Sequence, residues 1–359
     1  MSEREQQRRD LILIGGSAGS LEVFRAILQT LPRGFPAAIL AVTHQSQSNP
    51  GILPWIANAT GNLPAKHPVD GELITPGHVY IAPPNQHLIV EGDHIRLTFG
   101  PKENRFRPAI DPLFRTAAAA HGPRVIAVIL SGLLDDGTLG MLYVKRAGGV
   151  CIAQDPDYAS ARSMPGSAIR YVGVDHVLKP DEIAPTVLRL VQSSIPDFPA
   201  PRAEGASTMS ERLTNDRPTN PAVPGNPDVA IAADNALLTG KMPGPPTGMT
   251  CPECGGAIWE MNDGGLVHYR CHVGHAYSAD SFVADHDDTV EQALWAAFRS
   301  LQESAALHVR MTETAQRANA KNLEALYREQ AAQAEANAEV LRNVLLRTPR
   351  PLVGAQQQG

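Results

Sequence analysis

The sequence predicts an α/β protein with a doubly wound, mainly parallel sheet, followed by a small cysteine-rich unit and a C-terminal α-helical hairpin. Three observations support this. Residues 11–192 alternate short apolar runs with amphipathic stretches, residues 249–279 concentrate cysteine and histidine, and residues 280–347 carry apolar residues at helical spacing. Strands that are apolar throughout and separated by helices indicate a parallel sheet covered on both faces. With 359 residues, 43% of them hydrophobic, the chain can form one large core and a smaller unit.

The elements of the first segment follow in chain order. LILI predicts the first strand, and a helix is expected from about Leu21. AAILAV from Ala37 and RVIAVIL from Arg124 predict buried strands, and GTLGMLYVKRAG, GVCIA and IAPTVLRLVQ continue the alternation. Residues 77–100 differ because short strands are broken by Pro-Pro-Asn and Gly-Asp turns. They predict an antiparallel excursion at the edge of the sheet.

The segments between and beyond these units have a different composition. Residues 1–10 form a charged tail without the apolar core of a signal peptide, and no run approaches the length of a membrane span. Residues 193–248 hold ten prolines in 56 residues and predict a linker, with at most a short helix near DVAIAADNALL. Residues 348–359 are expected to be a flexible tail.

Charge and cysteine usage narrow the class of protein. The formal net charge is −6 and no long run of one sign occurs, so the chain has no basic footprint for nucleic acid. Its four cysteines are Cys151, Cys251, Cys254 and Cys271, and the last three cluster at metal-ligand spacing instead of forming a disulfide framework. We therefore expect a cytoplasmic protein, with Cys151 as a packed core thiol.

The turn GGSAGS, residues 15–20, allows three interpretations. A dinucleotide-binding turn would need glycine at position 17, and the second strand ends without an acidic residue for a ribose. The nucleophile elbow of α/β-hydrolases matches G-x-S-x-G literally, but that fold needs several strands before its elbow, and here the motif ends the first strand. The third interpretation keeps Ser17 as a nucleophile on a different α/β scaffold, with a histidine and a carboxylate at the same sheet edge.

Such partners follow two other predicted strands. His44 comes directly after ILAVT, and Asp135 and Asp136 come after VIAVILSGLL. Each has a simpler alternative role, since His44 can end a strand and Asp136 can be the N-cap of the next helix. Loops at the carboxyl ends of parallel strands meet at one edge, so the three positions together favour a triad in the order Ser, His, Asp.

Six motifs follow one another in residues 11 to about 191. They are GGSAGS (15–20), Thr43-His44, YIAPPNQHL (80–88), RPAIDPLF (107–114), LSGLLDDG (130–137) and Ser163-Met164-Pro165 with Ala168. In this order and at compatible spacing they resemble motifs of the catalytic domain of the chemotaxis protein-glutamate methylesterases, the CheB family. The family's motifs are Gly-Ala-Ser-Thr-Gly-Gly, Gln-His, Ile-Ala-Pro…His, Arg-Pro-Ser-Val-Asp…Leu-Phe, Leu-Thr-Gly-Met-Gly-x-Asp-Gly and Gly-Met-Pro…Ala.

The resemblance implies a function and its residues. Ser17 is the expected nucleophile, His44 the general base and Asp136, which aligns with the family's Asp-Gly pair, the residue that orients His44. The loop residues Ala18, Gly19 and Leu133 are expected around the oxyanion. Glutamate methyl esters of chemoreceptor-like proteins would be hydrolysed to glutamate and methanol without a cofactor, and a primary amide can enter the same cycle, so glutamine deamidation is a second expected activity.

The chain also departs from the family pattern. Ala18 replaces a threonine, Ser20 replaces a glycine, and Leu-Leu-Asp, with Leu134 in the middle, replaces Met-Gly-x before Asp136. The alternative function is therefore a weak or inactive esterase fold that acts as a signalling scaffold. A receiver domain usually precedes the family's catalytic domain. Only about ten residues precede the first strand here, so control is expected from the C-terminal half or from partners.

The C-terminal half predicts a metal site and a helical pair. Cys251-x2-Cys254, sixteen residues and Cys271-x3-His275 have the spacing of a zinc ribbon, which predicts a structural zinc held by these four side chains. His272 or His268 are the alternatives to His275. Helical periodicity in residues 280–347, interrupted near RANAKN, predicts a helical hairpin. Its helices can dimerise, fold back on the esterase domain or dock a signalling partner, and their Ala-rich faces do not choose among these.

Overall fold

The computed structural model of the chain describes residues 8–46, 48–195 and 244–347. These residues belong to two compact units, which divide between Phe282 and Val283. Most of the expected N-terminal tail, most of the expected linker with its short helix, and the expected C-terminal tail lie outside the described residues.

A seven-stranded sheet forms the centre of the first unit. Its order is β10-β9-β8-β1-β2-β5-β3, and every neighbouring pair is parallel. The strands are β1 (Leu11–Gly16), β2 (Ala38–Thr43), β3 (Ala65–Lys66), β5 (Val79–Ile81), β8 (Val125–Ile129), β9 (Val150–Gln154) and β10 (His176–Leu178). The central strands are buried on both faces, as their uninterrupted apolar sequences require. The predicted doubly wound α/β fold is confirmed.

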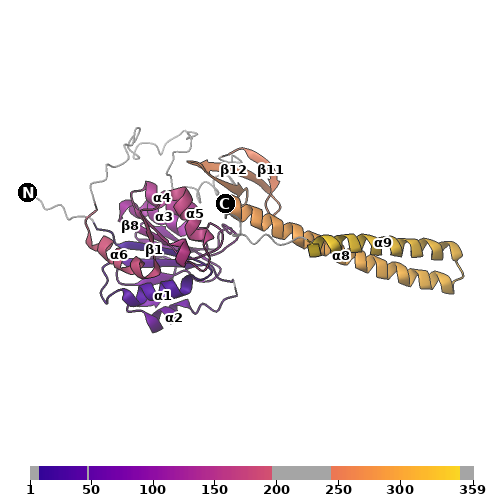
Figure 1. Cartoon of the computed structure of the whole chain (residues 1–359), viewed down its shortest axis with the longest axis horizontal. Helices are drawn as coiled ribbons and strands as arrows, with labels where there is room; N and C mark the ends of the chain where they lie inside the picture. Colours follow the sequence, from indigo (N-terminus) through magenta and orange to yellow (C-terminus); the bar gives the residue numbers. More distant parts are fainter. Residues whose placement is uncertain (1–7, 47, 196–243, 348–359) are drawn as a thin grey trace, which may run out of the picture. The chain divides into compact units, whose positions relative to one another are not determined.

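Helices cover both faces of this sheet. Side chains of α1 (Ser20–Thr30), α2 (Leu53–Thr60) and α6 (Pro180–Gln192) join one buried cluster, and those of α3 (Ile110–His121), α4 (Thr138–Arg146) and α5 (Ser163–Val172) join the other. Figure 1 shows β1 and β8 between α1 on one side and α3 and α4 on the other. The predicted core thiol Cys151 lies fully buried in the second cluster.

The prediction for residues 77–100 is wrong in its first part. Three residues of this segment form β5, which pairs with β2 in parallel inside the main sheet. Only β6 (His87–Glu91) and β7 (His94–Thr98) form an antiparallel hairpin, joined by β4 (Glu72–Leu73) in a separate three-stranded sheet. A three-residue strand carries too little pattern to show its direction.

The cysteine-rich segment forms a four-stranded antiparallel sheet within the same compact unit. Its strands are β11 (Pro246–Thr250), β12 (Ala257–Asp263), β13 (Leu266–Cys271) and β14 (Ala276–Ser278). A tight turn joins β12 to β13, where Gly264 and Gly265 both have positive φ, a conformation that favours glycine. Ser278 ends β14 and caps the next helix, since its hydroxyl accepts a hydrogen bond from the N–H of Ser281.

The second unit consists of two long helices. The helix α8 (Ala279–Arg317) starts in the first unit, and α9 (Lys321–Arg347) follows a short break in which Asn319 has φ 57°. Several alanine side chains of the two helices are buried, among them Ala305 and Ala315 of α8 and Ala331, Ala334 and Ala338 of α9. The predicted pair of helices is confirmed. None of the described helices is both long and apolar enough to cross a membrane.

We predict opposite effects for two glycine-to-alanine substitutions in helices. A Cβ on Gly140 of α4 would lie 2.6 Å from the Cβ of Phe114 and 3.0 Å from the carbonyl oxygen of Asp111, both on α3. A Cβ on Gly166 of α5 would meet nothing within 4 Å. Gly140→Ala should therefore lower the free energy of unfolding by about 1–3 kcal/mol, and Gly166→Ala should raise it by about 0.5–1 kcal/mol.

Chemical denaturation of the two variants and the unchanged chain measures both effects. Equal changes in the two variants would show that α3 and α4 do not approach as closely at Gly140 as the structure indicates.

Candidate active site and cysteine cluster

Ser17 stands at the tip of the turn that joins β1 to α1. Its N–H donates to the carbonyl of Ser131 at 2.9 Å, which ties the turn to the loop after β8. Gly19 has φ 76°, and this left-handed residue lets the chain enter α1 within three residues of the strand. The N–H groups of Ala18 and Gly19, which make no backbone hydrogen bond within the described part of the chain, remain available to an oxyanion beside the helix N-terminus.

His44 follows the neighbouring strand in register with Ser17. Gly16 of β1 pairs with Thr43 of β2, and the His44 N–H donates to the Gly16 carbonyl at 3.2 Å. The imidazole stacks on the ring of Phe106, with centroids 3.7 Å apart and planes 9° from parallel. Its Nε2 lies 2.7 Å from Oδ2 of Asp136. Its buried Nδ1 has no hydrogen-bond partner among the described residues, so it is the ring atom able to accept a proton.

Asp136 is a fully buried carboxylate with four donors. The His44 ring and the N–H of Ile110 bind Oδ2, both at 2.7 Å. The side chain of Asn104 and the N–H of Asp111 bind Oδ1 at 2.9 and 3.2 Å. Burial alone would raise the pKa of Asp136, but these bonds and the His44 charge outweigh it, so the pKa is lowered. The group therefore stays ionised and holds the Nε2 proton of His44.

Two further carboxyl groups lie close to Asp136 and behave differently. Burial and the charge of Asp136 raise the pKa of Asp111 well above its usual range. Its oxygens accept from the Gly140 N–H at 2.6 Å and from Asn104 at 2.8 Å. Burial also raises the pKa of Asp135 to about 7, against a hydrogen bond from the Ser278 hydroxyl. Of the two adjacent aspartates, only Asp136 contacts His44, as the resemblance implies.

An open cavity of about 530 Å³ connects Ser17 and His44. The loop before α3 contributes three basic residues to its lining, Lys102, Arg105 and Arg107. Arg107 is fixed by the side chain of Asn85 and two backbone carbonyls, and Lys102 pairs with Glu253. The cavity is therefore lined by cationic side chains although the whole chain carries a net charge of −6.

The structure accommodates two of the three departures from the family pattern. Ser20 is buried, and its hydroxyl donates to the Ser17 carbonyl at 2.7 Å, so it adds a hydrogen bond inside the turn. Leu134 has φ 60°, a left-handed conformation that suits the family's usual glycine and is unfavourable for leucine. The backbone thus keeps the shape that glycine would favour. Ala18 is exposed, and half-exposed Leu133 lies in the same loop as Leu134.

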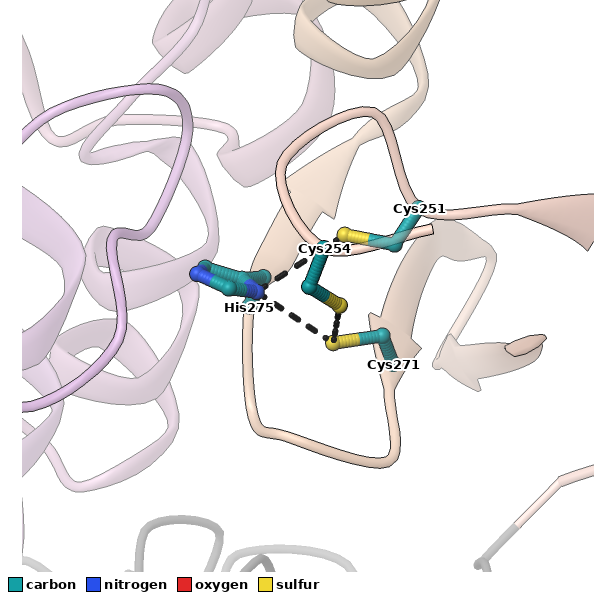
Figure 2. A group of neighbouring side chains, drawn as sticks. All are labelled: Cys251, Cys254, Cys271 and His275. Atoms are coloured by element: carbon teal, nitrogen blue, oxygen red, sulfur yellow. Dashed lines mark hydrogen bonds between the residues drawn. The ribbon is translucent and has the colours of Figure 1, made fainter. Parts of the chain in front are cut away.

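The structure brings Cys251, Cys254, Cys271 and His275 together, with one ligand atom from each within 4.8 Å of the others. Figure 2 shows the sulfurs and Nδ1 of His275 gathered in one place, with Nδ1 3.5 Å from Cys271 Sγ and 3.7 Å from Cys251 Sγ. Three thiols and one imidazole nitrogen at this separation fit a tetrahedral metal ion.

The two alternative histidines do not join the cluster. Nε2 of His268 lies 2.8 Å from Oδ2 of Asp263, on the adjacent strand of the hairpin. The His272 ring is exposed and lies over Gly256, where a Cβ would come within 2.1 Å of its Cε1. Of the three histidines considered from the sequence, His275 is therefore the one placed to bind a metal.

Sequence reasoning did not single out Phe106, Asn104 or Asp111. Asp111 is the aspartate of RPAIDPLF, so that motif offered a signal for it. Asn104 and Phe106 precede the motif and carry no pattern of their own, because their contacts depend on a loop in which Asn104 and Arg105 both have positive φ.

Comparison with known proteins gives one consistent family. The profile of the family described as CheB methylesterase matches residues 12–187. A protein of Leptospira interrogans is 38% identical over 187 residues, which cover 52% of this chain and 97% of that protein. Protein-glutamate methylesterase/protein-glutamine glutaminase 1 of Syntrophus aciditrophicus is 35% identical over 53% of this chain and 55% of its own length. The crystal structure of the Thermotoga maritima CheB methylesterase catalytic domain is 34% identical, covers 52% of this chain and 100% of that chain, and has a TM-score of 0.49.

We predict that Asp135→Asn stabilises the protein more at high pH than at low pH. The pKa of Asp135 is about 7 in the folded protein and about 3.9 in an unfolded chain. Between these values the folded state binds the extra proton, so the carboxyl group costs stability as pH rises. Asparagine carries no such cost, and the gain in unfolding free energy should be about 2 kcal/mol larger at pH 8 than at pH 5.

Denaturation at both pH values measures the difference. Asp157→Asn, at an exposed carboxylate, is the control and should change stability equally at the two pH values. A gain for Asp135→Asn that does not depend on pH would contradict the raised pKa.

Proposed function

Because the chain belongs to the CheB methylesterase family, we propose that it is a serine hydrolase that demethylates glutamate methyl esters of chemoreceptor-like proteins and deamidates glutamine. The observation that carries this proposal is the ion pair between His44 and the buried Asp136 beside the cavity that exposes Ser17. Relatives named protein-glutamate methylesterase/protein-glutamine glutaminase support both activities.

In the proposed cycle Ser17 Oγ attacks the ester carbonyl carbon while Nδ1 of His44 takes its proton. The oxyanion of the tetrahedral intermediate is held by the N–H groups of Ala18 and Gly19, with the N–H of Leu133 as a further donor. The carbon–oxygen bond to the methoxy group then breaks, and His44 returns the proton so that methanol leaves an acyl-enzyme. Water, deprotonated by His44, attacks the acyl carbon, and glutamate leaves as Ser17 regains its proton. With an amide, ammonia leaves in place of methanol.

The roles of the two ring nitrogens follow from the contacts of His44. Nε2 is bound to Asp136, so it carries a proton and Nδ1 presents its lone pair. When Nδ1 accepts the serine proton, the ring becomes a cation next to a carboxylate that is already ionised. Stacking on Phe106 holds the ring in the plane that both nitrogens need.

The basic residues around the cavity support an acidic substrate surface. Lys102, Arg105 and Arg107 line the cavity with Ser17. The product of each turnover is a new carboxylate, and a protein segment that is repeatedly demethylated is rich in such groups. Opposite charges at the rim favour encounter and are screened by salt.

The scaffold alternative is not favoured. It rested on Ser20, Leu134 and Ala18. Ser20 adds a hydrogen bond inside the turn, and Leu134 keeps the left-handed backbone that the family's usual glycine favours. The cytoplasmic address stays a prediction. So does docking of a signalling partner on the helical hairpin, where exposed apolar side chains such as Leu307, Val340 and Leu346 are consistent with a partner surface.

We also propose that the cysteine cluster holds a structural zinc ion. Zinc favours three thiolates and one imidazole in a closed tetrahedral shell, and all four positions would be filled by protein. None of Cys251, Cys254, Cys271 and His275 lines the cavity of Ser17, so the ion would order the small sheet and take no part in the reaction.

We predict that Ser17→Ala abolishes methanol release from a methylated receptor fragment. Without the hydroxyl no acyl-enzyme forms, so the rate should fall by roughly three orders of magnitude or more. Ser46→Ala is the matched control, because Ser46 lines the same cavity and should leave the rate within a few-fold. Gas chromatography of released methanol measures both rates. Equal release from Ser17→Ala and the unchanged chain would refute the nucleophile, and none from any variant would favour the scaffold.

We predict about one equivalent of zinc per chain in protein purified under reducing conditions without chelator. His275→Asn should fall below about half an equivalent, since it removes one of four ligands, and His272→Asn should keep the full content. Elemental analysis by mass spectrometry reads the stoichiometry. Loss of zinc in His272→Asn together with its retention in His275→Asn would reverse the ligand assignment.

A further inference from the structure

The loop before α3 touches both proposed partners of Ser17. Phe106 stacks on the His44 ring, and the Asn104 amide group donates one N–H to Asp136 and the other to Asp111. Asn104 has φ 49° and Arg105 has φ 75°. Two consecutive non-glycine residues in this conformation persist only when their surroundings hold them. What holds this loop therefore also controls the contacts of His44 and Asp136.

Hydrogen bonds from the backbone of the cysteine-rich sheet hold the loop before α3 in place. The Asn104 N–H donates to the carbonyl of Ala276 at 2.8 Å, and the Ala276 N–H donates to the carbonyl of Lys102 at 3.3 Å. The first residue of β14, Ala276, thus forms an isolated β-bridge with Glu103 of the loop. The loop residue in this bridge, buried Glu103, also pairs with Arg115 of α3 and with Arg270 of β13.

The end of β14 and the first turn of α8 determine which way the Asn104 amide faces. Its Oδ1 accepts from the Ser278 N–H at 2.8 Å and from the Ser281 hydroxyl at 2.9 Å. A backbone N–H can only donate, so the amide oxygen must face β14 and the amide nitrogen must face the two carboxyl groups. Without Ser278 and Ser281 the amide could turn its oxygen toward Asp136, and the carboxylate would lose a donor and gain a repulsive neighbour.

The residues that hold the loop are next to the cluster in the chain. Arg270 directly precedes Cys271, and Ala276 directly follows His275. A metal bound by these side chains would therefore fix both strands that contact the loop.

We propose that Asn104 is a positioning residue for Asp136 and that the cysteine-rich sheet, when it holds its metal, sets the orientation of Asn104, so that hydrolase activity depends on metal loading. The inference rests on the proposed function, because it assigns a role through the Ser17, His44 and Asp136 triad. It assigns the C-terminal sheet a part in catalysis although no residue of that sheet enters the reaction.

The first test follows the loop without relying on turnover. The full chain is compared with chelator-treated chain, with Cys254→Ser and with the control His272→Ala, by hydrogen–deuterium exchange read by mass spectrometry. We expect exchange in residues 102–106 and 276–281 to quicken at least tenfold on chelation and in Cys254→Ser, to recover in the chelated chain with zinc chloride, and to stay slow in His272→Ala. Unchanged exchange in β1 and β8 shows that the fold survives. Equal exchange rates of residues 102–106 with and without the metal would overturn the proposal.

The second test measures the reactivity of Ser17 with a fluorophosphonate, a reagent that needs no protein substrate. We expect labelling to fall about tenfold in metal-free chain and in Asn104→Ala, and less in Ser281→Ala, which removes one of two donors to Oδ1. Asn104→Ala should also move the acid limb of labelling to higher pH, because Asn104 helps to lower the pKa of Asp136. A uniform loss at every pH would indicate only a structural role and contradict positioning.

The two tests separate the possible failures. Absence of labelling in every variant, with loop exchange that still follows the metal, would refute the proposed triad and with it the role of Asn104. Full labelling of Ser17 in metal-free chain whose loop exchanges rapidly would refute the dependence of activity on the metal, and would leave the proposed triad intact.

Discussion

The candidate active site depends on keeping one carboxylate charged in the protein interior. Moving an ionised group out of water is costly unless its oxygens are hydrogen-bonded, and Asp136 meets this demand with four donors. Two of them are backbone N–H groups at the start of α3, where the helix dipole also favours negative charge. Three features bring these donors to the Asp136 carboxylate. They are the packing of α3 against α4, their close approach at Gly140 and the loop before α3.

The neighbouring carboxyl groups show how the same burial gives different results. Asp111 shares a donor with Asp136 and sits near its charge, which favours the protonated form. Asp135 has one hydroxyl donor and titrates near neutrality. Three buried acids that lie close together in the fold thus keep different pKa values because their hydrogen-bond donors differ.

Much of this arrangement could be predicted from the sequence, and the limits have physical causes. Apolar strands and the polar residues that follow them are local patterns, so the sheet and the meeting of Ser17, His44 and Asp136 at its edge could be predicted. The parallel pairing of β5 with β2 could not be predicted, because a strand of three residues has too little pattern to show its partner or its direction. The contacts of Asn104 and Phe106 could not be predicted from the sequence. They depend on the left-handed backbone of Asn104 and Arg105, which is maintained by contacts with residues far away in the chain. The spacing of the cysteines was informative, but choosing among three histidines required the hairpin that pairs His268 with Asp263.

The bond between Asn104 and Ser278 joins residues 174 positions apart in the chain. During synthesis the parallel sheet, Ser17, His44 and Asp136 are complete long before the strand that contacts Asn104 leaves the ribosome. If that strand sets the orientation of the Asn104 amide, a growing chain carries a folded catalytic centre that lacks this support until β14 has formed. The cysteine-rich sheet then acts as a checkpoint on maturation, because the hydrolase reaches full activity only after that sheet has folded.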